Sequence, residues 1–108
     1  MIGGNTILEL QRKTAAKNAI GEAVEAWETA QSLTGWLDYS SGESPRTSFN
    51  SKIQESTHFF IGDYVAVEVK PEECRAVCNG EVYDVLIIDN PMGMNRQIEI
   101  YLKYTGAQ

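Results

Sequence analysis

The stretch VYDVLIIDNPMGMNRQIEIYLKY, residues 82–104, contains two apolar runs separated by turn-forming residues. The second run alternates apolar and polar residues, and a period of two is typical of a strand with one buried face. The first run is apolar on both faces near its end, as a central strand is. Because Asn90, Pro91 and Gly93 favour a turn, the stretch predicts an antiparallel hairpin. One face of the second strand carries Ile98, Ile100, Leu102 and Tyr104, and the predicted core residues are Val85, Ile87, Ile98, Ile100 and Leu102.

The residues before this hairpin predict further strands. Asn79 and Gly80 form an Asn-Gly pair, the strongest short-range signal for a two-residue hairpin turn, which extends the hairpin to a three-stranded meander. Upstream, HFFIGDYVAVEV (58–69) alternates valines with other residues and predicts one strand, with Gly62 at a bulge or sharp bend. TILELQR (6–12) and the short aromatic GWLDYS (35–40) are also predicted strands.

The segment 13–33 fits two structures. Its apolar residues follow helical spacing and it is rich in alanine, the best helix former. Asn18 and Gly21 favour a turn, however, and the residues after them alternate as in a strand. Local sequence alone leaves helix and strand open.

These elements predict one all-β domain, residues 1–108: a small antiparallel β-barrel or sandwich of five to six strands with one long polar loop, 41–55. The loop includes most of SSGESPRTSFNSK, in which Arg46, Phe49 and Lys52 are the exposed side chains that could meet a partner. Phe49 fits a local anchor equally well. Because the loop has few apolar groups to offset the entropy of ordering, we expect it to be mobile in the isolated chain.

Charge and hydropathy exclude several classes of protein. The chain of 108 residues has a net charge of -6, which leaves no basic excess to neutralise phosphates and argues against tight nucleic-acid binding. No apolar run has the length of a membrane span, and no signal-peptide pattern follows Met1, so synthesis in a cytoplasm is expected. Cys74 and Cys78 are too far apart on a strand for a disulfide and are predicted to be reduced thiols.

The sequence contains no pattern that predicts catalysis. It lacks a nucleophile motif, a phosphate-binding glycine loop and a metal-ligand cluster, so we expect neither an enzyme nor a bound cofactor or metal. Trp27 and Trp36 could stack on a base or sugar, but large aromatic residues more often fill the core, and this is the favoured interpretation. His58, at a strand entry, is expected to be a partly exposed residue at the core edge.

The order of motifs along nearly the whole chain resembles a known family. QRKT is followed by EAW, GWLDYSSGE, HFFIGD, CNGEVYDVLIIDNP and RQIEIYLK, and the most specific part is NGEVYDVLIIDNP with Asn95 and Arg96 after it. This pattern resembles the head-tail joining, or head-closure, proteins of tailed bacteriophages and prophages. The chain departs from the pattern at Gly62 and Asp63, where members often carry an arginine.

The resemblance implies a small β-barrel that assembles as a ring homo-oligomer at the virion head-tail interface, after synthesis in the host bacterial cytoplasm. The ring would lie beneath the portal or an adaptor protein and above a tail completion protein. Genomic DNA would pass through without tight binding, and the loop with Arg46, Phe49 and Lys52 would order on assembly. The resemblance also implies a β-hairpin or extended arm across 13–33. The alternative function is a small OB-like barrel that binds a ligand or single-stranded nucleic acid.

Overall fold

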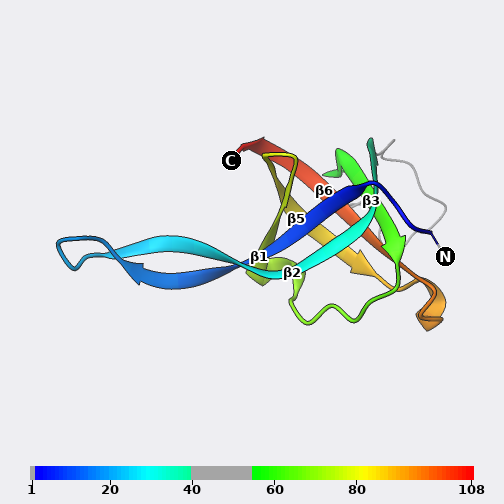
Figure 1. The fold of residues 1–108 in the computed structure, drawn as a ribbon, viewed down its shortest axis with the longest axis horizontal. Coiled ribbons are helices and arrows are strands. Elements are labelled where there is room, and N and C mark those ends of the chain that lie inside the picture. The colour runs from blue at the N-terminus through cyan, green and yellow to red at the C-terminus, as the bar shows by residue number, and fades with distance from the viewer. Residues whose placement is uncertain (1, 40–54) are drawn as a thin grey trace.

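The computed structural model describes residues 2–39 and 55–108, and its strands form one antiparallel sheet (Figure 1). The predicted loop, with Arg46, Phe49 and Lys52, lies mostly outside the described residues. The strands are β1 (Thr6–Lys17), β2 (Ala23–Tyr39), β3 (His58–Asp63), β4 (Cys74–Cys78), β5 (Glu81–Asp89) and β6 (Gln97–Ala107). Two short 3-10 turns, η2 (Pro71–Glu73) and η3 (Pro91–Gly93), precede β4 and β6.

The sheet closes on itself in the order β1-β2-β3-β6-β5-β4. Closure occurs where Glu9–Arg12 of β1 pair with Cys74–Val77 of β4 in antiparallel register. The fold is therefore all-β, as predicted, and of the two predicted forms it is the barrel. Closure also satisfies the backbone groups that open sheet edges would leave unpaired.

Both predicted hairpins at the C-terminal end are confirmed. Asn79 and Gly80 connect β4 to β5 with positive φ angles of 53° and 78°, the conformation that a tight two-residue turn requires. Between β5 and β6, the Asn90 side chain accepts a hydrogen bond from the Asn95 backbone N–H at 3.0 Å and holds the turn through η3. The Asn-Gly and Asn-Pro signals therefore mark the two chain reversals.

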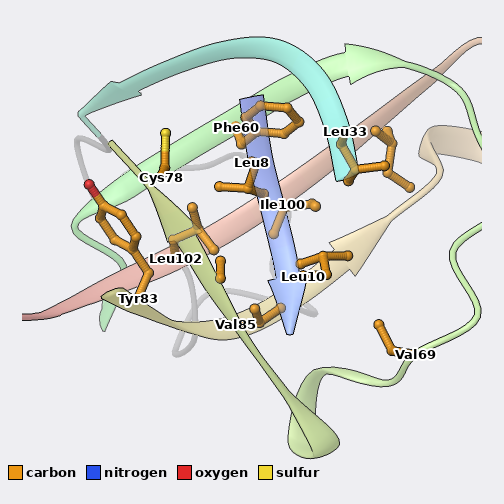
Figure 2. Close-up of a cluster of buried hydrophobic side chains, with 12 residues drawn as sticks. Leu8, Leu10, Leu33, Phe60, Val69, Cys78, Tyr83, Val85, Ile100 and Leu102 are labelled. Atoms are coloured by element: carbon orange, nitrogen blue, oxygen red, sulfur yellow. The ribbon is translucent and has the colours of Figure 1, made fainter. Parts of the chain in front are cut away.

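The core consists of inward-facing side chains from all six strands (Figure 2). Leu8, Leu10, Phe60, Ile100 and Leu102 are fully buried, and the five predicted core residues of β5 and β6 are all buried. Tyr104 shares their strand face but lies further along β6, where it is 44% exposed. The alternation of the last strand thus predicts its buried face up to Leu102.

The segment 13–33 is extended, as the resemblance implies, and contains no helix. β1 and β2 pair from Thr6 opposite Gly35 to Lys17 opposite Ala23. The reversal is held by Asn18, whose side-chain oxygen accepts hydrogen bonds from the N–H groups of Ile20 and Glu22. Local turn chemistry thus prevails over alanine's helix propensity, and β2 continues without interruption into the separately predicted strand GWLDYS.

The predicted strand 58–69 is wrong beyond Asp63. Its neighbour β6 begins at Gln97, opposite Asp63, so the following residues have no strand on that side. On the other side a side chain takes the place of a strand, because Gln31 Nε2 donates to the Ala66 carbonyl at 2.9 Å. Val69 is nevertheless buried against the core. Alternation alone does not produce a strand here, because strand pairing depends on neighbours distant in sequence.

The bulge predicted at Gly62 is also wrong. Gly62 pairs with Gly35 in regular register, and the two backbones approach closely. A Cβ atom on Gly35 would lie 2.2 Å from the Ile61 carbonyl oxygen, and one on Gly62 would lie 2.6 Å from the Thr34 carbonyl oxygen. Glycine is required here by this contact between strands rather than by a bend.

Candidate functional site

The outer halves of β1 and β2 form a two-stranded arm that projects from the barrel, defined here as residues 13–27 (Figure 1). β4 pairs with β1 as far as Arg12, and β3 pairs with β2 from Gly35 onwards. Within the part of the chain that the structure describes, the arm strands therefore pair with each other alone. The arm gives the molecule its elongated dimensions of 51 × 28 × 23 Å.

The surface of the arm carries apolar groups that have no cover in the described residues. Ile20, in the turn, is 77% exposed, and Val24 is 40% exposed. Lys13, Thr14, Ala15, Ala23 and Val24 line a shallow hollow of about 510 Å³. A lone two-stranded ribbon is marginally stable in water, and exposed apolar surface on such an element is typical of a contact site.

The base of the arm is attached to the barrel by Arg75 of β4. The Arg75 guanidinium carbon lies 4.4 Å from the centroid of the Trp27 ring, a cation-π arrangement. Arg75 Nε also donates to Oε1 of buried Gln11 at 2.8 Å. Trp27 therefore supports the arm and is not a core residue.

Trp36 also lies outside the core. Its side chain is 46% exposed, and its indole Nε1 donates to the Ile2 carbonyl at 3.3 Å. The prediction that both tryptophans fill the core is wrong, because smaller residues such as Leu8 and Ile100 occupy the barrel interior.

The N-terminal segment is fixed to β3 by Asp63. The Asp63 carboxylate accepts hydrogen bonds from the N–H groups of Ile2, at 2.5 Å, and Gly3, at 3.0 Å. These hydrogen bonds lower the pKa of Asp63 below its ordinary value of 3.8. Gly4 then packs on Gly35, where an added Cβ would meet the Gly35 backbone at 2.2 Å. Asp63 thus makes an internal contact.

A second feature lies at the other end of β2 from the arm. Four rings gather there, from β2, β3, β5 and β6, and together with Glu81 they line a cavity of about 360 Å³. We call this feature the tyrosine cleft, formed by Tyr39, His58, Glu81, Tyr83 and Tyr104. The His58 ring centroid lies 4.9 Å from those of both Tyr39 and Tyr83, and Tyr83 lies 5.8 Å from Tyr104. His58 is half-buried, as expected for the core edge.

The described residues contain two cysteines and were searched for groups that could hold a metal ion. No group of three or more His, Cys, Asp or Glu residues is placed to hold a metal ion in this part of the chain. Cys74 and Cys78 carry free thiols. Burial, with the nearby Glu73 and Glu72 carboxylates, raises the pKa of Cys74 to about 11, so this thiol is protonated near neutral pH. Across residues 2–39 and 55–108, no helix has the length and apolar character needed to span a membrane.

The family model described as phage head completion protein matches residues 4–103, almost the full length of the fold. The chain belongs to the phage head completion protein family. No curated protein matches the chain significantly. Family membership makes it a structural component of the phage head, located in the virion and in contact with other head or tail proteins. Arg46, Phe49 and Lys52, the contact residues predicted from the sequence, remain a prediction because they lie outside the described residues.

Proposed function

We propose that this head completion protein assembles as a ring beneath the portal, closes the DNA-filled head and provides the platform for tail attachment. Family membership supports the general role, and the arm supports the ring. The arm carries the proposal because it presents strand edges and apolar groups that the described part of its own chain does not cover. A structural element of this kind is stabilised by contact with another subunit.

The arm suits a ring because its two edges differ. One edge is the end of β1, with Lys13 and Lys17, and the other is the start of β2, which follows Glu22 and includes Val24. Contact between unlike surfaces of successive copies is heterologous, and such contacts close into rings when the rotation permits. Open edges of β-strands also pair readily with another chain. We therefore infer that the arm of each copy contacts the next copy.

The charge of the protein suits a channel through which DNA passes. Each subunit contributes a net charge of -6, so a ring of subunits repels phosphates rather than binding them. The alternative function, an OB-like nucleic-acid-binding barrel, requires aromatic faces open to bases and a basic surface. Trp36 and Tyr39 are exposed, but Arg75 covers a face of Trp27 and the net charge of -6 leaves no basic excess, so the ring is favoured over this alternative.

The test is complementation of phage heads made without this protein. The arm variant carries Ile20→Asp and Val24→Asp, which place charges on the proposed contact while the barrel is unaltered. The matched control is Met92→Asp, which adds a charge at another highly exposed apolar residue, outside the arm. We expect the control to restore DNA retention and tail attachment, and the arm variant to fail while it remains folded. Full restoration by the arm variant would contradict an assembly role for the arm.

A further inference from the structure

The tyrosine cleft contains a polar atom that the rest of the described structure leaves unused. Oε2 of Glu81 is buried and has no hydrogen-bond partner among the described residues. The Glu81 carboxylate also lies beside the Tyr104 hydroxyl and raises the pKa of Tyr104. A buried acceptor without a donor is unfavourable, and an ionised carboxylate can only accept. A donor from outside these residues can therefore satisfy this atom, and a positively charged donor is the best match for a carboxylate.

The walls of the cleft favour the same kind of group. Aromatic ring faces attract cations, arginine more often than lysine, and the planar guanidinium group stacks on a ring while it donates to a carboxylate. The chain already uses this combination at the base of the arm, where Arg75 covers Trp27 and donates to Gln11. The tyrosine cleft offers aromatic faces and an acceptor in the same way, but no lysine or arginine of the described residues lines it.

We propose that the tyrosine cleft binds the guanidinium group of an arginine side chain presented by a neighbouring protein of the virion. The group would donate to Glu81 Oε2 and lie against the rings of Tyr39 and His58. Tyr39 is 80% exposed and forms the outer wall of the cleft. A chain with a net charge of -6 also favours a basic partner. That the partner is another protein of the virion rests on the proposed function. The binding of a guanidinium group by the cleft does not rest on it.

The first experiment uses the isolated protein and N-acetyl-arginine amide, with the ring signals of His58 and the tyrosines followed by NMR. We expect saturable shifts confined to the cleft. N-acetyl-citrulline amide, which has nearly the same shape without the charge, should bind at least tenfold more weakly. Equal shifts with both compounds, or no saturable shift with the arginine compound, would overturn the proposal.

Two variants locate the binding group. Glu81→Gln removes the carboxylate charge and should weaken binding at least tenfold, whereas Asp84→Asn removes a charge from the same strand at an exposed position outside the cleft and should not. Tyr39→Ala, at a mostly exposed side chain, should leave the fold intact and weaken binding several-fold. Unchanged binding in Tyr39→Ala and Glu81→Gln would overturn the proposal. Binding that appears only in a variant with both Arg46→Ala and Lys52→Ala would also overturn the proposal. The wild-type cleft would then be filled by a cation of the same chain rather than by a partner.

The partner is tested separately, by complementation of heads with Glu81→Gln. We expect reduced recovery of tailed particles with Glu81→Gln and normal recovery with Asp84→Asn. If Glu81→Gln loses arginine binding but supports normal assembly, the cleft does not dock a virion partner, while the ring proposal stands. If the wild-type protein itself fails to complement, the proposed function fails, and the arginine titration still decides the chemistry of the cleft.

Discussion

Arg75 covers the ring of Trp27 with its guanidinium carbon 4.4 Å from the ring centroid, and so joins the arm to the strand that closes the barrel. The same side chain donates to Gln11, which is buried. We expect Arg75→Ala to lower the free energy of unfolding by about 1–3 kcal/mol, because it removes the cation-π contact and leaves a buried amide oxygen without its donor. Urea denaturation measures the loss. Arg75→Lys keeps the charge but not the planar guanidinium geometry, so it should retain only part of the stability that Arg75→Ala loses. A loss below about 0.5 kcal/mol for Arg75→Ala would contradict this role, because substitutions of ordinary surface residues have effects of that size.

Gly35 should tolerate no side chain. Its added Cβ would lie 2.2 Å from the Ile61 carbonyl oxygen, and backbone cannot move aside as the end of a flexible side chain can. We expect Gly35→Ala to cost more than about 3 kcal/mol or to prevent folding, the upper range for overpacking. Gly21→Asn is the control, because that position has open space and a φ of 84°, which asparagine tolerates. Thermal unfolding compares the two; a stable Gly35→Ala variant would show that the strands can separate at this point.

Ile100 tests the core predicted from the last strand. Its side chain is fully buried in the main core cluster. Ile100→Ala should therefore cost about 2–5 kcal/mol in chemical denaturation. Ile7→Ala, at a side chain that is 60% exposed, should cost much less. Similar losses for the two variants would mean that the assignment of buried and exposed faces is wrong.

Asp63 should make the free energy of unfolding depend on pH in the acidic range. Because the N–H groups of Ile2 and Gly3 lower its pKa in the folded state, the ionised carboxylate stabilises the fold. This contribution is complete above the pKa of the unfolded chain, about 4, and is lost as the pH falls through the lower pKa of the folded state. Asp63→Asn should therefore be less stable than the wild type at neutral pH, and the difference should narrow below about pH 4. A difference that stays constant from neutral to acid pH would contradict this role.

The residues predicted in the polar loop give a test that is independent of the barrel. A variant with Arg46, Phe49 and Lys52 all changed to Ala should unfold almost as the wild type does, because the sequence gives the loop little apolar area to bury. Assembly of phage with this variant should stop at heads that leak DNA or lack tails. Normal numbers of infectious particles would mean that the loop is a passive connection.

The sequence predicts the barrel strands well where pairing is local. Alternation in β6 and the Asn-Gly pair before β5 are properties of short segments, and each specifies a chain reversal or a buried face by itself. The extended arm was predicted from the resemblance alone, because the alanine-rich composition of this segment favours a helix. The structure shows that the Asn18 side chain holds a turn there instead. The end of β3, at Asp63, was missed because it depends on where β6 begins, at Gln97.

The two surfaces proposed as contact sites could not be predicted from local patterns. The tyrosine cleft combines residues from four strands, and Tyr39 and Tyr104 are far apart in the sequence. The tryptophans were assigned to the core on size, whereas the closed barrel is filled by smaller aliphatic residues and Phe60. The position of Trp27 is instead set by its cation-π contact with Arg75. This contact joins β2 to β4, which are not neighbours in the sheet.

The central claim, that the protein closes the head as a ring beneath the portal, is tested most directly by electron microscopy of heads made with and without it. Heads made without the protein should have lost DNA or lack tails. Addition of the purified protein should restore ring-shaped density at the portal vertex together with DNA retention and tail attachment. Full, tailed and infectious particles without the protein, or binding of the added protein elsewhere on the head, would contradict the claim.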